Sequence, residues 1–207
     1  MSHLVNDLIN NGYLKSDQII EAFVKIRRVS FIPEDLMSAA EVNIPLPIGH
    51  GQTISQPLTV AFMLELLDPQ KGQNILDVGS GSGWTTALLA HIVGESGSVI
   101  GIERIFELYR KGKRNINKYG YIKKGIVQLY CQDGAKGYSK NAPYDRILVS
   151  ASVEEVPKEL KKQLKIGGKM VIPVRNSVCY FEKLGEDDFH REEFRGFSFV
   201  PLIENGK

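Results

Sequence analysis

Five apolar runs, each separated from the next by a helical segment or a loop, constrain the fold of this 207-residue chain most strongly. Strands that alternate with helices are typical of a parallel sheet covered by helices on both faces. The runs lie at residues 74–78, 98–102, 126–130, 146–150 and 169–174. We therefore predict an α/β fold with a doubly wound, mostly parallel sheet of the Rossmann-like type.

The N-terminal segment 1–57 is expected to hold two short helices and a functional loop. Apolar residues recur at helical spacing after Ser2 and again after Ser16, and serine is a favoured helix N-cap. The stretch 45–57 lacks periodicity and is rich in proline and glycine, so we predict an ordered loop, and loops of this length usually have a function. Pro57 suits the first turn of the helix that follows.

Residues 58–207 are expected to form the cofactor-binding core, and the whole chain 1–207 a single domain. The helical pattern disappears after residue 175, where the stretches 178–184 and 194–202 are predicted to be strands joined by a polar turn. We expect these two strands to form an antiparallel edge of the sheet.

Composition and charge exclude several classes of function. The 26 Lys and Arg residues exceed the 24 Asp and Glu residues by only two, which is too weakly basic to imply nucleic acid as an obligatory partner. Cys131 and Cys179 lack metal-ligand spacing and are too few for a disulfide framework, so no metal site is predicted. Neither a signal peptide nor a membrane span is evident, so we expect a cytoplasmic monomer.

A glycine-rich turn, Asp77-Val78-Gly79-Ser80-Gly81-Ser82-Gly83, follows the first predicted strand and opens a helix. Gly79 and Gly81 let the backbone turn tightly and approach a nucleotide-like ligand closely. A dinucleotide site normally has a third glycine where this chain has Trp84, which disfavours NAD and FAD. Asp77 would repel a pyrophosphate but suits a cationic ligand, and S-adenosyl-L-methionine carries an ammonium and a sulfonium without phosphate.

Acidic residues also end the next two predicted strands. Glu103 ends the second strand, where a carboxylate can accept hydrogen bonds from both ribose hydroxyls of a nucleoside. Asp133 and Gly134 follow the third strand and would border the adenine. A strand-end aspartate is often only a helix cap and a glycine-rich turn often only a turn, but three such features in one crevice indicate S-adenosyl-L-methionine.

Over most of its length the sequence resembles the protein-L-isoaspartate O-methyltransferase family. The most specific match is the loop PLPIGHGQTISQP at 45–57, which general methyltransferases do not share. Other matches lie at 76–83, 101–104, 137–145, 164–168 and 199–202. The resemblance implies methyl transfer to isoaspartyl residues of damaged proteins, with S-adenosyl-L-homocysteine as co-product and a methyl ester that returns to aspartate through a succinimide.

The resemblance also implies roles for individual residues. The family's active-site serine matches Ser55, and its cofactor contacts match Gln52, Thr53, Ile54, Asp77, Glu103, Asp133 and Gly134. Another family contact falls at Val60, which could touch adenosine only by packing. We assign Ser55 to orienting the substrate carboxylate; the alternative is an N-cap of the helix begun by Pro57. His50 is expected to shape the loop, because methylation of a carboxylate needs no base.

Two segments depart from the family pattern, Val174–Cys179 and Ser150-Ala151-Ser152. Neither segment contains a predicted cofactor residue. Both changes bear instead on how a peptide substrate would be recognised. Two other functions therefore stay open at this point. One is methylation of another acceptor, such as tRNA or a small molecule, and the other is a non-catalytic module that binds the cofactor and docks onto proteins.

Overall fold

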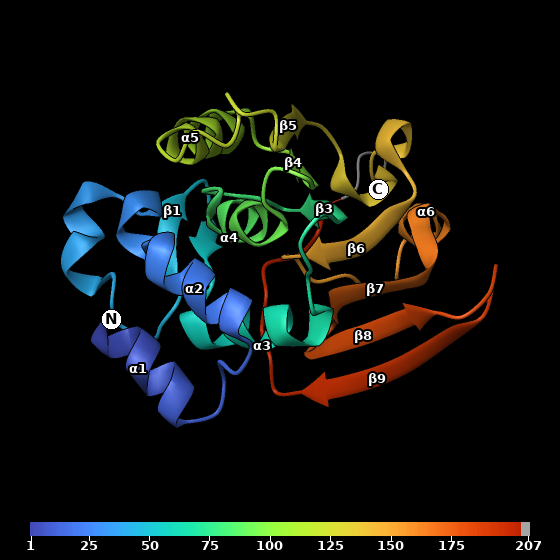
Figure 1. Cartoon of the computed structure of the whole chain (residues 1–207), viewed down its shortest axis with the longest axis horizontal. Helices are drawn as coiled ribbons and strands as arrows, with labels where there is room; N and C mark the ends of the chain where they lie inside the picture. Colours follow the sequence, from blue (N-terminus) through green and yellow to red (C-terminus); the bar gives the residue numbers. More distant parts are fainter. Residues whose placement is uncertain (204–207) are drawn as a thin grey trace.

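The central sheet has the strand order β5-β4-β3-β6-β7-β8-β9 in the computed structural model, which describes residues 1–203 (Figure 1). The first five strands in this order run parallel, and β8 and β9 are antiparallel to their neighbours. The strands are β3 (Asn74–Val78), β4 (Ser98–Glu103), β5 (Val127–Cys131), β6 (Tyr144–Val149), β7 (Leu164–Val174), β8 (Ser177–Lys183) and β9 (Phe189–Arg195). The predicted fold class is confirmed; residues 204–207 of the predicted core lie outside the described part.

Helices cover both faces of the sheet. One face packs against α3 (Pro57–Leu67), α4 (Trp84–Val93) and α5 (Phe106–Asn117), and the other against α6 (Lys158–Gln163). The two predicted N-terminal helices, α1 (His3–Asn10) and α2 (Asp17–Lys25), lie outside α3 and α4 (Figure 1). Residues 1–203 also contain four 3-10 turns, η1 (Arg28–Phe31), η2 (Glu34–Ala39), η3 (Gly134–Lys136) and η4 (Ser139–Asn141).

Alternating side chains of the buried strands build two hydrophobic clusters. Ile75 faces the cluster formed with α3, α4 and α5, whereas Leu76 and Val78 of the same strand face the cluster on the α6 side. Both faces are buried because a parallel sheet is covered on both sides. The continuous apolar runs of the sequence follow from this double burial.

The strand order reverses beside β3 and sets the position of a crevice. The chain passes from β3 to β4 and β5 on one side and then returns to β6 on the other side of β3. Connections leave the carboxyl ends of β3 and β6 in opposite directions, which opens a ligand crevice between them. The glycine-rich turn begins at this point, directly after Val78.

The stretch 45–57, which we predicted to be an ordered loop, contains a short β-hairpin. β1 (Leu46–Gly49) pairs antiparallel with β2 (Gln52–Ile54). Gly49 at the end of β1 and the two turn residues His50 and Gly51 have positive φ angles, of 99°, 55° and 68°. The two glycines allow the backbone to adopt these positive φ angles. The hairpin could not be predicted from the sequence pattern because its strands are only four and three residues long.

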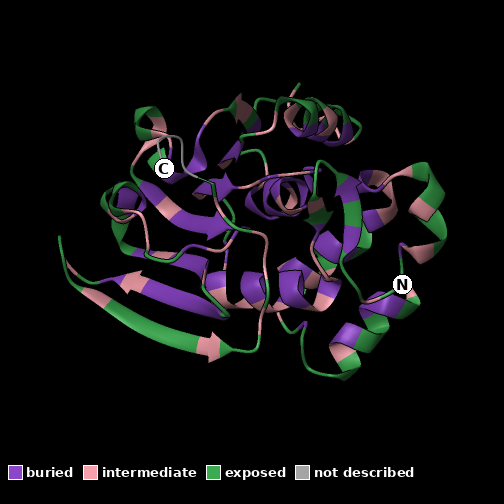
Figure 2. Cartoon of the chain, turned by 180° about the vertical axis from the view of Figure 1, so that it is seen from behind, coloured by how far each residue is buried: buried purple, intermediate pink, exposed green. Residues whose placement is uncertain are grey.

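The last strand lies earlier in the chain than the predicted stretch 194–202. β9 spans Phe189–Arg195 and pairs with β8, and in the segment 196–203 after it the sheet pairing is one isolated bridge between Pro201 and Ser152. Figure 2 shows that β9 is largely exposed, whereas β8 is buried. An edge strand facing solvent carries charged residues, here in the sequence FHREEFR, which hides it from an apolar pattern.

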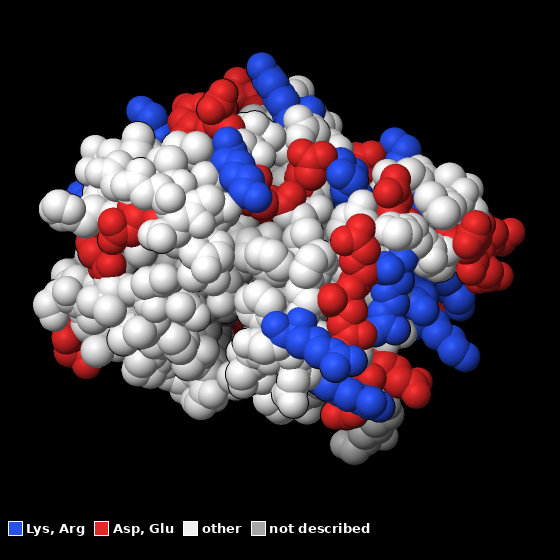
Figure 3. All heavy atoms as spheres, turned by 90° about the horizontal axis from the view of Figure 1, so that it is seen from below, with Lys and Arg blue, Asp and Glu red and all other residues white. Residues whose placement is uncertain are grey.

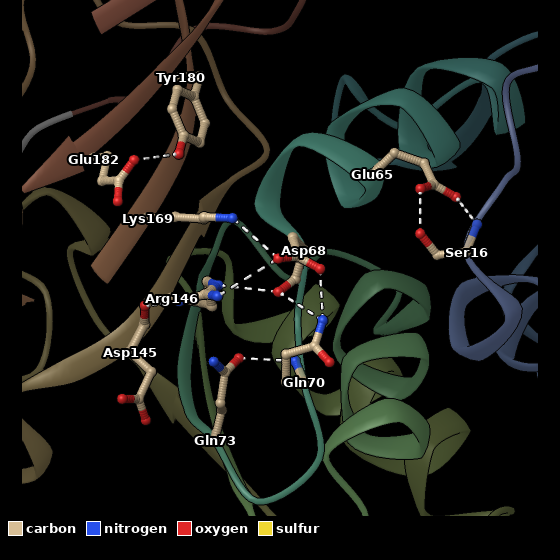
Figure 4. Close-up of polar contacts among 10 residues, drawn as sticks. All are labelled: Ser16, Glu65, Asp68, Gln70, Gln73, Asp145, Arg146, Lys169, Tyr180 and Glu182. Atoms are coloured by element: carbon tan, nitrogen blue, oxygen red, sulfur yellow. Dashed lines mark hydrogen bonds and ion pairs between the residues drawn. The ribbon is translucent and has the colours of Figure 1, made fainter. Parts of the chain in front are cut away.

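Polar side chains anchor the C-terminal end of α3 (Figure 4). Glu65 accepts hydrogen bonds from the backbone N–H groups of Lys15 and Ser16 and from the Ser16 hydroxyl, at 2.8, 3.0 and 2.6 Å. Ser16 therefore begins α2 without capping it by its own side chain, whereas the Ser2 hydroxyl caps α1. Asp68 follows the last residue of α3. Its carboxylate accepts a hydrogen bond from Lys169 Nζ at 3.0 Å, and its backbone carbonyl accepts one from Arg146 Nε at 3.1 Å. These contacts fix α3, which follows the hairpin, against the sheet.

Candidate functional site

A cavity opens at the carboxyl ends of β3 and β4, at the crevice set by the strand order. Its lining combines apolar side chains with a small number of polar groups, as is typical of small-molecule sites. The β1–β2 hairpin, the glycine-rich turn, the end of β4 and the segment before the C-terminus form its walls. Eight of the predicted site residues line it: Gln52, Thr53, Ile54, Ser55, Gly79, Gly81, Glu103 and Gly134.

The glycine-rich turn gives the cavity a wall of bare backbone. Gly79, Gly81 and Gly83 have φ angles of 79°, 52° and 90°, which side chains of L-residues rarely adopt. A Cβ atom at Gly81 would lie 3.3 Å from Ile48 Cδ1 of the hairpin. The turn therefore needs glycine both for its conformation and for the close approach of the hairpin.

The carboxylate of Glu103 joins the end of β4 to this turn. Its Oε2 accepts from the Gly81 N–H at 2.8 Å and its Oε1 from the Ile105 N–H at 2.8 Å. The side chain is buried, yet it lines the cavity. Each carboxylate oxygen has a second lone pair, so both oxygens can still accept from a ligand hydroxyl.

Asp77 lies behind the turn and does not line the cavity within the described residues. Its Oδ2 accepts from Thr85 Oγ1 at 2.9 Å and from Thr86 Oγ1 at 2.6 Å, and its buried Oδ1 has no hydrogen-bond partner in residues 1–203. Burial, and to a lesser extent the charge of Glu103, raise the pKa of Asp77 to about 6 against the opposing threonine bonds. The carboxylate holds the start of α4 in place.

Asp133 and Gly134 have different roles at the end of β5. The Asp133 carboxylate caps the 3-10 turn η3, accepting from the Ala135 N–H at 3.0 Å, and does not line the cavity within the described residues. Gly134 does line it, and a Cβ atom there would lie 2.5 Å from Val78 Cγ1. Of these two predicted residues, Gly134 therefore lines the cavity, and Asp133 lies next to it in the chain.

Ser55 lies where this cavity meets a second, more open groove. Thr53, Ser55, Ser150 and Val200 line both spaces. Ser55 is not an N-cap, since Gln56 occupies the N-cap position of α3 and makes no side-chain capping bond. The N-cap alternative for Ser55 is therefore wrong.

The open groove has aromatic walls and little charge. The Phe62 ring stacks on Phe197 and meets Phe194 edge to face, with both centroid distances 5.2 Å. Arg195 is the one charged side chain that lines the groove among the described residues. Figure 3 views the molecule from the side of α1, α3 and β9, where charged side chains are sparse toward the N-terminal helices and gather toward the sheet edge.

Comparison with known proteins identifies the family. The family model for protein-L-isoaspartate (D-aspartate) O-methyltransferase matches residues 1–207. The chain belongs to this family. Curated relatives with the name protein-L-isoaspartate O-methyltransferase include those of Methanopyrus kandleri, 47% identical over 97% of this chain and 89% of the relative, and of Ignicoccus hospitalis, 42% identical over 97% and 96%.

Solved structures of the same family share the fold. A protein-L-isoaspartate O-methyltransferase from Plasmodium falciparum, in complex with S-adenosyl-L-homocysteine, aligns with a TM-score of 0.87 at 25% identity and covers 98% of this chain and 97% of that one. A second structure with the name protein-L-isoaspartate O-methyltransferase has a TM-score of 0.89 at 30% identity, covering 98% of this chain and 65% of that one. The N-terminal helices and hairpin are thus included in the likeness.

In this member of the family the segment 200–203 forms one wall of the cavity. From the sequence we had expected most of this segment to be the end of a strand. Ser152 N–H donates to Val200 O at 2.8 Å, and Leu202 N–H donates to Ser152 O at 2.7 Å. These bonds hold the segment across the end of β6, where it lines the cavity. The sequence FVPL at 199–202, which matches the family pattern, was the one signal that could have indicated a site here.

The described residues contain neither a metal-binding cluster nor a membrane-spanning helix. Within residues 1–203 no group of three or more His, Cys, Asp or Glu side chains is placed to hold a metal ion. No helix in that range has the length and apolar character needed to cross a membrane.

Proposed function

We propose that this chain transfers a methyl group from S-adenosyl-L-methionine to the free carboxylate of L-isoaspartyl residues in damaged proteins. One observation carries the proposal beyond family membership: Ser55 lies at the junction of the cavity that the predicted cofactor residues line and the open, largely uncharged groove. A methyl donor in the first space and a peptide in the second would meet at this residue. The enzyme is thus a protein-L-isoaspartate O-methyltransferase.

The cavity residues fit the cofactor. Glu103 offers carboxylate oxygens to ribose hydroxyls, the glycine-rich turn offers bare backbone, and apolar side chains offer a surface for adenine. These apolar side chains are Ile48, Ile54, Val60, Ile102, Ile105 and Leu108. We assign Gln52, Thr53 and Ile54 to the hairpin side of the cofactor and Gly134 to the adenine side. Asp77 and Asp133 act by holding the turn and the η3 cap, since their carboxylates lie behind the wall.

The proposed chemistry requires this chain to position the acceptor carboxylate and does not require a general base. When bound, the cofactor supplies an electrophilic methyl group on a sulfonium. The acceptor carboxylate is already ionised at neutral pH, because its ordinary pKa is about 4. Ser55 donates a hydrogen bond that orients this carboxylate, and the hairpin and segment 200–203 exclude water from it. His50, which lies in the hairpin turn, needs no part in proton transfer.

The product explains how methylation leads to repair. The methyl ester has a better leaving group than the free carboxylate, so the following backbone nitrogen attacks it, methanol leaves and a succinimide forms. Hydrolysis of the succinimide then yields a fraction of normal aspartate. S-adenosyl-L-homocysteine is the co-product, and the steps after methylation require no group of this chain.

Transfer of labelled methyl from S-adenosyl-L-methionine to paired peptides tests the proposal. The two peptides share one sequence and differ only in isoaspartate or aspartate at one position. Strong labelling of the isoaspartyl peptide alone is expected. Equal labelling of both peptides, or of normal glutamate, would contradict the substrate assignment. Cofactor binding without labelling of either peptide would favour another acceptor or a non-catalytic module.

Three further expectations stay predictions. We propose that residues 1–57 and 58–207 form a single domain, which the shared hydrophobic cluster of α1, α2, α3 and α4 supports. We also expect a monomer with a cytoplasmic location and no nucleic-acid partner. Light scattering coupled to size exclusion tests the monomer, and a mass near 46 kDa, about twice the 23.1 kDa of the chain, would contradict it.

A further inference from the structure

A buried arginine lies beneath the active-site hairpin. Arg28 begins the turn η1 and is only 4% exposed. Burial lowers the pKa of its guanidinium to about 10, so the group is still charged at neutral pH. Burying a charge is costly unless it is paired, yet none of the ion pairs found within residues 1–203 involves Arg28. A site that retains such a group needs another reason for it.

Four backbone carbonyls take the place of a carboxylate. Arg28 Nη1 donates to Ala40 O at 3.4 Å and to Val42 O at 3.1 Å. Its Nη2 donates to Ile44 O at 2.7 Å and to Ser55 O at 3.2 Å. Ile44 precedes the β1–β2 hairpin and Ser55 follows it, so one nitrogen atom clamps the two ends of the hairpin together.

A second contact connects the same guanidinium to the cofactor cavity. The Arg28 Cζ atom lies 5.7 Å from the ring centroid of Trp84, a distance at which cations and aromatic faces attract. Trp84 lines the cavity and donates through Nε1 to Ile26 O at 3.1 Å. Arg28 is therefore held between a wall of the cofactor cavity and the backbone of Ser55.

We infer that Arg28 is a positioning residue for the methyl transfer: its guanidinium fixes the backbone of Ser55 at the junction of the two spaces. The inference rests on the proposed function. A planar guanidinium directs several N–H groups at once, so its fork can reach carbonyls on both sides of the hairpin, whereas a lysine ammonium reaches fewer of them. A displacement of Ser55 by about 1 Å can lower turnover by as much as 100-fold.

A double-mutant cycle between Arg28 and Ser55 tests this inference. Arg28→Lys keeps the charge and the apolar stem, and it is combined with Ser55→Ala. In the wild-type background, Arg28→Lys is expected to lower kcat on the isoaspartyl peptide about 10- to 100-fold. In the Ser55→Ala background the same change should lower kcat less than about twofold, because residues that act through one another are not additive. An equal factor in both backgrounds would overturn the inference.

Controls separate positioning from loss of structure. Arg27→Lys changes the exposed neighbour and should leave kcat unchanged. Circular dichroism follows unfolding of each variant, and kcat is measured below the lowest midpoint. Trp84 is the one tryptophan of the sequence, so its fluorescence reports cofactor affinity, which should be unchanged in Arg28→Lys. A variant with a lower midpoint but wild-type kcat would show a structural role alone. An inactive wild-type protein would instead contradict the proposed function.

Discussion

Glu103 and Gly81 are joined by a hydrogen bond of 2.8 Å from the Gly81 N–H to Oε2 of the carboxylate. The bond links the end of β4 to the glycine-rich turn that follows β3. The same carboxylate accepts from the Ile105 N–H just before α5. One side chain thus holds the two strand ends that wall the cofactor cavity in a fixed relation before any ligand binds, which reduces the cost of ordering them on binding.

Replacing this carboxylate should weaken cofactor binding. In Glu103→Gln the amide nitrogen must face the N–H of either Gly81 or Ile105, and a buried group left without its partner costs about 1–3 kcal/mol. We expect the affinity for S-adenosyl-L-methionine to fall about 10- to 100-fold, with kcat near wild type at saturating cofactor. Titration calorimetry measures the affinity. Glu107→Gln, on the exposed side of α5, is the control and should bind as wild type.

The buried carboxylate of Asp77 predicts a pH dependence of stability without cofactor. Its pKa is raised from 3.8 to about 6 in the folded protein, mainly by burial, so the folded state binds the proton more tightly than the unfolded state. The resulting stability is fully present below about pH 4 and is lost as pH rises through 6, by roughly 3 kcal/mol. Urea unfolding of wild type and Asp77→Asn at pH 4 to 7.5 checks this. Parallel curves for the two proteins would contradict it.

The core of the fold could be predicted from sequence because its strands and its glycine-rich turn each leave a local pattern. Strands buried on both faces leave continuous apolar runs, as in NILDV at 74–78, and a turn that needs positive φ leaves glycines. The predicted cofactor residues Glu103 and Gly134 reached the cavity because parallel strands end at one edge.

Other features depend on contacts between distant residues and left no local pattern. The antiparallel edge was predicted, but its last strand, β9, was placed too late in the chain because an exposed edge strand is charged. The direction of the Asp77 carboxylate, toward Thr85 and Thr86, is set by how α4 packs on β3. Arg28 is one of 26 cationic residues in the sequence, and only the tertiary fold brings it within reach of Ser55 O.

Removing the Ser55 hydroxyl should lower turnover and spare the cofactor. A hydrogen bond to a charged group contributes about 1.5–3 kcal/mol, so Ser55→Ala is expected to lower kcat about 10- to 100-fold. Cofactor affinity should stay within a factor of about two, because the glycine-rich turn and Glu103 are unchanged. Steady-state kinetics with the isoaspartyl peptide and fluorescence titration of Trp84 measure the two quantities. Weaker cofactor binding with wild-type kcat would reverse the assigned roles.

Gly112 of α5 should resist a substitution that helix propensity favours. Alanine is better than glycine in a helix by about 1 kcal/mol. A Cβ atom at Gly112, however, would lie 2.9 Å from Gly81 O, which is backbone of the cofactor turn. Overpacking of this kind costs about 1–3 kcal/mol, so Gly112→Ala should lower the midpoint of thermal unfolding by a few degrees and weaken cofactor binding.

The matched control for Gly112 is its exposed neighbour. Lys113→Ala lies on the solvent side of α5 and should keep the wild-type midpoint and cofactor affinity. A higher midpoint for Gly112→Ala with unchanged affinity would mean that α5 shifts away from the turn at no cost. The contact between α5 and Gly81 would then have no part in shaping the cavity, and the cofactor site would depend on the hairpin and Glu103 alone.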